Sequence, residues 1–567
     1  MRDLRWQILI AVGGLLLVVG LLLRQTPTIQ SVSPEPVSGG SHIEALIGQP
    51  VRLNPVLDFN NQVDEDVDRL IYRGLVRFDS RGNPVPDLAE QLAVSADARL
   101  YTVTLRENLT WHDGEPVTSD DVVYTYSRFK EEGYPGPPDL HDFWEEINII
   151  QLDERTVQFE LPESFAPFPD TLSVGLLPDH LLRGVSSADL PDHPFNLEPI
   201  GTGPFRFERF VTEGEEISGV TLTAFEDFHR GEPFLDRVEF RYFDSHDAAW
   251  EAYQSETVQA IGSVTEAILN PVLDAQQLDL HTARLPRVKT VYMNLNHGDK
   301  TFFSESDLRQ ALMLGINRQA LVDRLMNGQA VVATGPVLPG TWAFAQELEP
   351  LPYDPIQASK QLDSLDWELP AGTSPGDEDY VRTNGEQELS FTMLHVDSPE
   401  EHALASMLQM YWADLGVDVS LQPVEPEQLR TALEERDYQA ALTEITLSRW
   451  PDPDPYMLWH DSQAQTGQNY AGFDDRNIGI WLERARTNPD RGRRADLYQN
   501  FQYRFQDLAP ALMLYHPVYN YAISAEMQGV RLGPLTDPSD RFAMIEEWHL
   551  LTRRNTSPAT EVPTETP

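Results

Sequence analysis

The sequence predicts an α/β body of two or three lobes that follows one N-terminal transmembrane helix. The chain has 567 residues, whereas a single hydrophobic core stops growing at roughly 250–300 residues. Short alternating runs that are typical of strands recur between segments with helical spacing. A long uncharged apolar run stands at the N-terminus.

The apolar run, residues 6–23, is long enough to cross a bilayer. As a helix it spans about 27 Å, close to the hydrocarbon thickness of a membrane. Arg2 and Arg5 precede it and a strongly acidic body follows, so the positive-inside bias leaves the short N-terminus in the cytoplasm and exports the body. A cleaved signal peptide is the alternative, but residues 21–26 offer no small-residue cleavage site. We predict an uncleaved anchor over residues 1–25.

Composition limits the partners of the exported body. The sequence has no cysteine, which excludes disulfides, thiolate chemistry and lipid attachment through a cysteine. Its formal net charge of −48 repels nucleic acid and anionic membrane surfaces. We therefore expect no nucleic-acid partner and interpret the acidity as a solvated surface that keeps the protein soluble. An acidity tuned to attract cationic ligands is the alternative.

Local patterns predict the elements of the body. Residues 26–44 are rich in Pro, Ser and Gly and predict a flexible stalk, and residues 551–567 predict a disordered tail. Residues 100–105 and 156–161 alternate apolar and polar side chains, as strands do. Residues 119–129 have helical spacing after an N-cap serine. The body is therefore expected to mix helices and strands.

The second half of the chain repeats this alternation. Residues 306–326 predict one helix, which begins with a Ser-Asp cap and places its leucines on one face. Residues 403–415 predict another helix, which stops at Gly416 and is followed by a strand over residues 417–422. A helix, a glycine stop and a strand in this order form an αβ unit.

Signatures of catalysis and of metal binding are missing from the sequence. It has no H-E-x-x-H helix, no phosphate-binding P-loop, no G-x-S-x-G elbow and no cysteine nucleophile. The fourteen histidines are dispersed, without the i, i+4 pairing that zinc sites often show. We expect a protein that is not an enzyme and holds neither a metal nor a cofactor. An exported hydrolase is the alternative.

Several segments along the chain together form a recognisable series. They are residues 70–79 (LIYRGLVRFD), 84–90 (PVPDLAE), 97–106 (DARLYTVTLR), 111–122 (WHDGEPVTSDDV), 200–205 (IGTGPF), 228–236 (FHRGEPFLD), 292–295 (YMNL) and 308–311 (LRQA). This series resembles the extracellular solute-binding proteins of peptide-type ABC transporters, family 5, which include oligopeptide- and dipeptide-binding proteins. The resemblance covers roughly residues 45–550.

The resemblance implies a two-lobed fold of the periplasmic-binding-protein type II class with an extra N-terminal lobe. The first lobe would span residues 45–285, with the extra lobe at about 71–180. The second lobe would span residues 286–515, and residues 516–550 would return to the first. The two hinge crossings are expected near residues 283–291 and 515–521.

The resemblance also implies a function. The chain is expected to be a monomeric, membrane-anchored binding protein of an ABC importer, single-pass in the cell membrane with its body outside the cytoplasm. It would close its lobes on a peptide or a related small solute and dock on permease subunits of the transporter. A receptor that reports its ligand to a membrane sensor is the alternative.

Residues 446–456, at the end of an apolar strand, are the first place to expect ligand contacts. Peptide-binding relatives carry an aspartate there that pairs with the α-ammonium of the peptide. If the segment is aligned on the Asp452-Pro453 pair, Arg449 takes that position and favours a carboxylate or other anion. If it is aligned on Trp450 with a gap, Asp452 takes the role and a cation is bound. Both registers stay open.

The remaining candidates are Asp454 in the same turn, Asp58 and Asn60 after the first strand, Tyr134 in the loop 133–139, and Tyr292 and Asn294 near a hinge. A cleft of this kind uses aromatic walls and a few polar groups to orient its ligand. A solvated turn or a scaffold role is the alternative for all of these residues.

Overall fold

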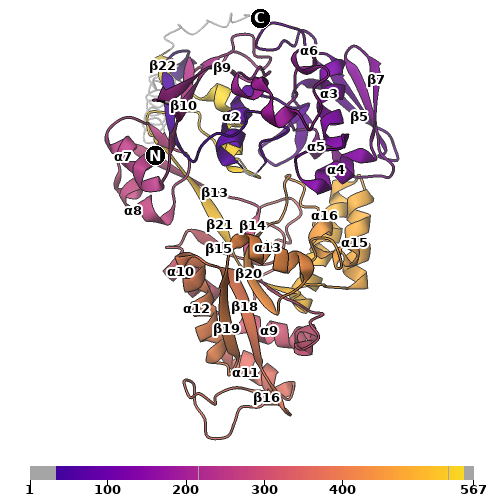
Figure 1. Ribbon diagram of the computed structural model, residues 1–567, viewed down its shortest axis with the longest axis vertical. Helices are drawn as coiled ribbons and strands as arrows, with labels where there is room; N and C mark the ends of the chain where they lie inside the picture. The colour runs from indigo at the N-terminus through magenta and orange to yellow at the C-terminus, as the bar shows by residue number, and fades with distance from the viewer. Residues whose placement is uncertain (1–33, 60, 215, 534, 555–567) are drawn as a thin grey trace, which may run out of the picture.

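The computed structural model describes residues 34–554 except residues 60, 215 and 534. Two lobes lie one above the other along the long axis (Figure 1). The predicted anchor, residues 1–25, and the candidate Asn60 lie outside the described residues. Within the described part of the chain, no helix combines the length and the apolar character that a membrane span needs.

One large sheet runs through both lobes, with the strand order β19-β18-β20-β14-β21-β12-β2-β11-β10-β9. Its first-lobe strands are β2 (Ser41–Ile47), β9 (Phe205–Glu213), β10 (Glu216–Ala224), β11 (Arg237–Phe243) and β12 (Ala260–Ile261). Strand β2 pairs in parallel with β11 and β12. The helices α7 (His246–Gln254) and α8 (Glu266–Asp274) pack on it through a small apolar core around Ala45 and Ile261.

The extra lobe is a separate four-stranded sheet with the order β5-β6-β8-β7. Its elements are β5 (Ala89–Val94), β6 (Leu100–Leu105), α3 (Ser119–Lys130), α4 (Pro138–Glu145), β7 (Asn148–Asp153), β8 (Thr156–Glu160), α5 (Phe168–Thr171) and α6 (Asp179–Leu182). In β6 the side chains alternate between buried and half-buried, as its sequence pattern predicts. The buried ones pack with an aromatic cluster that includes Trp144 and Phe168.

The start of α3 differs from the prediction by one residue. The N-cap is Thr118, not Ser119. The Thr118 hydroxyl accepts from the backbone N–H of Asp120, and the Asp121 carboxylate accepts from the backbone N–H of Thr118. This is a capping box, in which two orphan backbone donors are satisfied reciprocally.

The second lobe surrounds β14 (Arg287–Met293), β18 (Ser390–Val396), β19 (Asp418–Val424) and β20 (Ala440–Thr446). Its longer helices are α9 (Ser306–Leu314), α10 (Arg318–Leu325), α11 (Pro355–Ser364), α12 (Pro399–Ala413), α13 (Pro426–Glu435), α15 (Arg476–Thr487) and α16 (Arg491–Leu508). The predicted αβ unit is present, because α12 leads through Gly416 into β19, which pairs in parallel with β18.

The single helix predicted over residues 306–326 is wrong, because the chain forms α9 and then α10. The break follows Gly315, where an added Cβ would lie 2.4 Å from a Leu415 methyl group. The Asn317 side chain then accepts a hydrogen bond from the backbone N–H of Ala320 and caps α10. Leucine spacing alone does not reveal this re-start, since both helices bury apolar faces in the same core.

Two crossings join the lobes. Strand β13 (Leu278–Arg284) belongs to the first lobe, and the chain enters the second lobe at β14. The long strand β21 (Ala511–Ser524) returns, pairing with β14 near its start and with β13 near its end. In Figure 1 it runs between the lobes. A strand shared by both lobes is suited to act as a hinge, because a few residues there absorb the backbone rotation.

The predicted flexible stalk and tail contain strands that pair with each other. Strand β1 (Pro34–Val37) is antiparallel to β22 (Leu551–Arg554), and β2 begins inside the predicted stalk. The prolines of β1 suit a two-stranded ribbon, in which one edge needs no donors. Local composition misses this pairing because the partners lie at opposite ends of the body.

Short elements complete the described chain. They are α2 (Gln62–Ile71), β3 (Val76–Phe78), β4 (Pro84–Pro86), β15 (Ala330–Val332), β16 (Thr383–Asn384), β17 (Gln387–Glu388) and α14 (Tyr456–Trp459), with 3-10 turns at Leu190–Asp192, Pro194–Leu197, Thr301–Ser304, Asp461–Gln463, Pro538–Phe542 and Ile545–Glu547. Of these, α2 lies at the junction of the lobes.

Candidate ligand-binding site between the lobes

A cavity of about 440 Å³ lies between the lobes beside the hinge. The first lobe contributes residues of β2 and α2 and residues 262–266, the hinge contributes residues 517–520, and the second lobe contributes Met326, Gln329 and Glu444. Small-ligand pockets measure about 300–1,000 Å³ and favour junctions between domains. The cavity is therefore the leading candidate for a ligand site.

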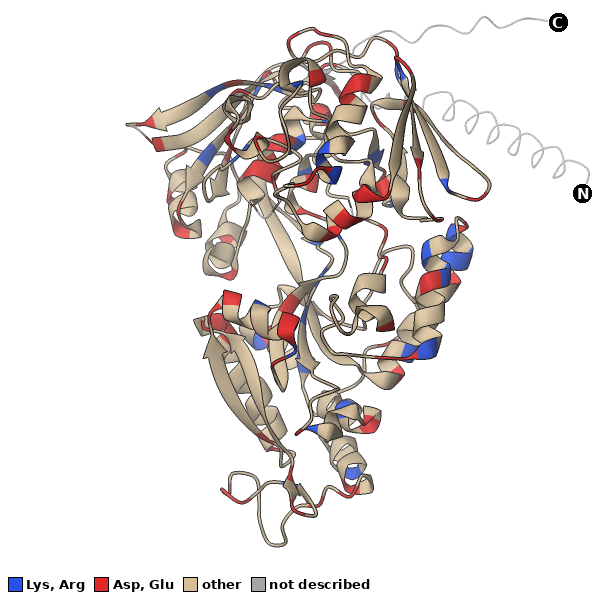
Figure 2. Ribbon diagram, turned by 45° about the vertical axis from the view of Figure 1, so that its right-hand side comes forward, with Lys and Arg blue, Asp and Glu red and all other residues tan. Residues whose placement is uncertain are grey.

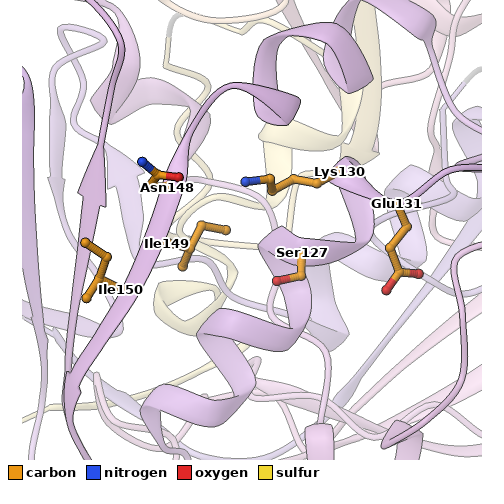
Figure 3. A pocket seen from close by; sticks show the side chains of 6 residues that line it. All are labelled: Ser127, Lys130, Glu131, Asn148, Ile149 and Ile150. Carbon is orange, nitrogen blue, oxygen red and sulfur yellow. The ribbon is translucent and has the colours of Figure 1, made fainter.

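A second hollow, of about 460 Å³, lies on the outside of the extra lobe between α3 and β7 (Figure 3). Its charged side chains are already engaged, since the Lys130 ammonium donates to the Ile147 carbonyl and Glu131 pairs with Arg128. All of its lining residues come from the extra lobe. The hollow therefore lies outside the junction of the two lobes.

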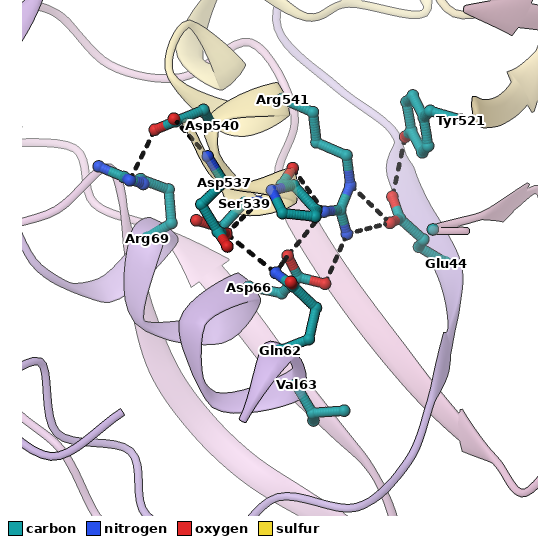
Figure 4. Close-up of polar contacts among 12 residues, drawn as sticks. Glu44, Gln62, Val63, Asp66, Arg69, Tyr521, Asp537, Ser539, Asp540 and Arg541 are labelled. Atoms are coloured by element: carbon teal, nitrogen blue, oxygen red, sulfur yellow. Dashed lines mark hydrogen bonds and ion pairs between the residues drawn. The ribbon is translucent and has the colours of Figure 1, made fainter. Parts of the chain in front are cut away.

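The first-lobe wall of the interlobe cavity rests on a buried ion network (Figure 4). Arg541 contacts Glu44 at 2.6 Å and Asp66 at 2.6 Å, and all three side chains are almost fully buried. Gln62 donates to Asp66 and to Asp537. A buried charge is tolerated when it is paired and hydrogen-bonded. Asp66 lines the cavity, but its charge is balanced by Arg541 within the wall.

Further carboxyl groups gather beside this network. Burial, together with the charge of the adjacent Asp537 carboxylate, raises the pKa of Glu65 to about 10. Burial also acts on Asp537, but hydrogen bonds from Glu65 and from Gln62 leave its pKa below the usual value. Glu65 thus stays protonated, and its carboxyl group donates a hydrogen bond to the ionised carboxylate of Asp537. Burial raises the pKa of Asp58 well above its usual range, against the opposing charge of Arg69.

The sequence candidates Arg449 and Asp58 both lie close to Tyr134. Arg449 of the second lobe approaches Asp139 of the first, with Nη1–Oδ2 at 3.3 Å and both side chains partly exposed. The Tyr134 hydroxyl donates to the Val56 carbonyl at 3.4 Å. Burial chiefly raises the pKa of Tyr134, and Asp58, Arg449 and Asp139 all lie near enough to affect it. Residues of both lobes therefore form one polar group here.

The other candidates of the Pro-rich turn hold the turn in place. Asp452 accepts from Arg494 through both oxygens, at 2.6 and 2.7 Å, and its backbone N–H donates to Asp170 of the first lobe at 3.0 Å. Asp454 pairs with Arg486 at 3.1 Å. Trp450 is half-buried. The carboxylates of Asp452 and Asp454 are thus already paired with arginines.

Tyr292 and Asn294 are scaffold residues of the second lobe in this structure. Tyr292 is fully buried and packs against the rings of Trp459 and Tyr470. The Asn294 amide donates to the carbonyl oxygens of Arg436 and Tyr438. Neither side chain lines the interlobe cavity. Both residues are close to the hinge in the sequence, but their side chains do not reach the cavity.

Charge is divided between the two sides of the cleft. Arginines gather on α15 and α16, which stand beneath acidic turns of the first lobe in Figure 2. Hydrogen bonds add to the contact, since the Ala166 N–H donates to the Arg486 carbonyl at 2.8 Å and the Ser164 hydroxyl to the Thr487 carbonyl at 2.7 Å. The lobes therefore touch at a polar contact opposite the hinge.

Sequence reasoning missed the charged residues that line the cavity itself, which are Asp66, Glu266, Arg287 and Glu444. Their position in the sequence was the signal that could have found two of them. Arg287 lies within the crossing predicted at residues 283–291, and Glu444 lies in the apolar strand before the Pro-rich turn. The structure offers no group of His, Asp and Glu side chains suited to a metal ion among the residues it describes.

A family model, the bacterial extracellular solute-binding proteins, family 5 Middle, matches residues 83–468. The chain belongs to this family. The family resemblance found in the sequence is thereby confirmed. The oligopeptide-binding protein AppA of Bacillus subtilis is 26% identical over 530 residues, covering 91% of this family 5 chain and 92% of the relative. The dipeptide-binding protein of Escherichia coli is 24% identical over 515 residues, covering 86% and 91%.

Solved structures share the architecture of this family 5 protein. AppA of Bacillus subtilis in complex with a nonapeptide has a TM-score of 0.70 and 24% identity, covering 91% of this chain and 100% of that one. NikZ of Campylobacter jejuni in complex with Ni(L-His) has a TM-score of 0.70 and 23% identity, covering 90% and 99%. HbpA2 of Haemophilus parasuis has a TM-score of 0.76 and 22% identity, covering 88% and 99%. The two-lobed α/β fold is thereby confirmed.

Proposed function

We propose that this protein is the binding component of an ABC importer, which captures a peptide or a related small solute between its lobes without chemical change. The interlobe cavity of about 440 Å³, bounded by both lobes and the hinge, is the observation that carries this proposal. Family membership supports it. The named relatives bind an oligopeptide, a dipeptide or a nickel-histidine chelate, so the family relation alone leaves the ligand class broad.

Closure of the lobes supplies the binding mechanism. Residues 45–285 with 516–550, and residues 286–515, would move as two bodies about β21 and the segment between β13 and β14. Closure removes water from the cavity, which strengthens each polar contact made inside it. The polar contact around Asp139 and Arg449 would limit how far the lobes separate.

The location and partners belong to the same proposal. An apolar helix over residues 1–25 would tether the monomer to the outer face of the cell membrane, where permease subunits take the ligand. The uncharged run at residues 6–23 and the arginines before it support this orientation. A protease added outside intact cells should then release the body, whereas a cytoplasmic body would stay protected.

A thermal-shift screen tests binding. The full-length chain in detergent should gain stability from one of three pools, which contain peptides, sugars or metal chelates, because a ligand that binds only the folded state stabilises it. Small-angle scattering with the stabilising pool should show a smaller radius of gyration. Stabilisation by no pool, or binding without compaction, would contradict capture by lobe closure.

A further inference from the structure

A hydrogen bond between the lobes lies beside the interlobe cavity. The Asn327 amide, which follows α10 in the second lobe, donates to the Glu266 carboxylate at 2.6 Å. Glu266 is the first residue of α8 in the first lobe, and it also lines the cavity. Both residues are exposed, and a glycine follows Asn327 in the sequence. The amide of an Asn-Gly pair therefore bridges the two lobes at this place.

This Asn-Gly pair ends α10 in a tight turn that is tied to the hinge. Asn327 and Gly328 have φ values of 46° and 78°, so both lie in the left-handed region that often follows a helix. The Gly328 N–H donates to the Val322 carbonyl at 3.1 Å. The side chain of the next residue, Gln329, accepts a hydrogen bond from the Asn520 amide of β21 at 2.8 Å. A change at Asn327 therefore acts next to the strand about which the lobes would move.

An asparagine that precedes a glycine can lose its side-chain nitrogen to its own backbone. The Gly328 nitrogen attacks Cγ of Asn327, the new C–N bond closes a succinimide ring, and the side-chain nitrogen leaves as ammonia with the proton of Gly328. Water then opens the ring and leaves aspartate or isoaspartate at position 327. Glycine has no Cβ to crowd the attacking nitrogen, and among the described residues no atom lies within 4 Å of the Cβ position built on Gly328. The nitrogen must first leave Val322, which the fraying of a helix end allows.

We propose that Asn327 is a deamidation site whose conversion breaks the contact between the lobes beside the hinge. Conversion places a carboxylate where the amide donated to Glu266. Aspartate visits the left-handed backbone region as asparagine does, so the new charge stays opposite Glu266. Two carboxylates at this distance repel each other, and neither has a hydrogen to donate. The attraction between α8 and α10 thereby becomes a repulsion, whichever ligand the cavity binds.

The other Asn-Gly pair of the sequence provides a natural control. Asn384 and Gly385 lie in the β16–β17 hairpin at the far tip of the second lobe (Figure 1). The Asn384 amide donates to the Leu365 carbonyl of the same lobe at 3.3 Å. Deamidation there adds the same charge to the protein but does not place it against the first lobe.

Peptide mapping by mass spectrometry tests the chemistry. The full-length chain in detergent is incubated in neutral and in mildly alkaline buffer, because base removes the proton of the attacking nitrogen. Asn327 and Asn384 should both convert to aspartate and isoaspartate, and faster in the alkaline buffer. Asn270 is also exposed, but Pro271 follows it and has no N–H, so Asn270 should stay unchanged. An intact Asn327 in a sample whose Asn384 has converted would overturn the proposal.

A distance measured between α8 and α10 tests the consequence. The chain has no cysteine, so spin labels attached to L273C on α8 and D323C on α10, both at exposed positions, report this distance alone. At low ionic strength N327D should lengthen it by about 3 Å, the room that one water needs between the carboxylates. N384D should keep the wild-type distance.

The double variant E266Q/N327D separates this contact from a general loss of structure. A glutamine amide at position 266 can donate to the new carboxylate, so the double variant should recover the wild-type distance. E266Q alone should also keep that distance, because two amides can still form a hydrogen bond. A wild-type distance in N327D, or a long distance that E266Q does not reverse, would overturn the proposal.

Discussion

Arg494 holds the Asp452 carboxylate with two nitrogens, at 2.6 and 2.7 Å, and both side chains are buried. An ammonium could bind Asp452 only by displacing this guanidinium. The alignment of the Pro-rich turn that assigns ammonium binding to Asp452 would therefore require this ion pair to break. Arg449 is partly exposed, and Asp139 contacts it from the opposite lobe.

Replacing Asp452 with asparagine should destabilise the second lobe strongly. The change removes the carboxylate that pairs with the buried Arg494, and breaking a buried ion pair costs about 3–5 kcal/mol. Urea denaturation of D452N measures the loss, and E388Q, which removes an exposed carboxylate, should unfold like the wild type. Wild-type stability of D452N would show that the pair is not needed to hold the turn.

Reversing Arg449 should open the ligand-free protein. R449D places an acid against Asp139, so the attraction across the cleft becomes repulsion. Small-angle scattering at low ionic strength should give a larger radius of gyration for R449D and for D139R than for the wild type. The double variant D139R/R449D restores opposite charges and should recover the wild-type value. No difference among the four proteins would mean that the contact does not set the lobe distance.

Alanine at position 201 should not be accommodated. A Cβ built on Gly201 would lie 1.9 Å from the backbone oxygen of Ile71, which cannot move without shifting the end of α2. The expected loss of stability is about 3 kcal/mol or more. Gly298 has no atom within 4 Å of its built Cβ, so G298A is the matched control and should unfold normally. Thermal melts of the two variants compare them, and equal melting temperatures would refute the steric argument.

His112 should contribute to loss of stability in acid. Burial lowers its pKa from 6.5 to about 4, because the ring is enclosed between Gly201 and Gly203. The unfolded chain takes up a proton below pH 6.5 while the folded one stays neutral, so stability falls as the pH drops from 6.5 toward 4. The contribution amounts to roughly 3 kcal/mol at most. Urea midpoints of H112Q should fall less steeply over this interval than those of the wild type, and parallel curves would contradict it.

The sequence predicts the secondary structure best where one face of an element is buried. Residues 100–105 are β6, because strict alternation matches a half-buried strand. The prediction of one long helix over residues 306–326 was wrong, because its leucines belong to two helices that pack into the same core. Pairing between distant segments, as in β1 and β22, leaves no local pattern to detect.

The site was harder to predict than the fold. The turn around Arg449 could be located by resemblance, but the engagement of Asp452 by Arg494 depends on α16, some forty residues further along the chain. Arg287 and Glu444 look like ordinary strand residues in the sequence. Their place in the wall of the cavity depends on the pairing of β14 with β20.

The ribbon of β1 and β22 joins the two ends of the described chain. Both ends of the described chain leave from this ribbon on the first lobe, so whatever is joined at residue 34 or residue 554 rotates with that lobe alone. If residue 34 is held by the proposed anchor, the second lobe would be the part that moves when the lobes close. A fluorophore attached at either end of the described chain would not report movement of the second lobe. One attached to the β16–β17 hairpin, at the far tip of the second lobe, would report the largest displacement.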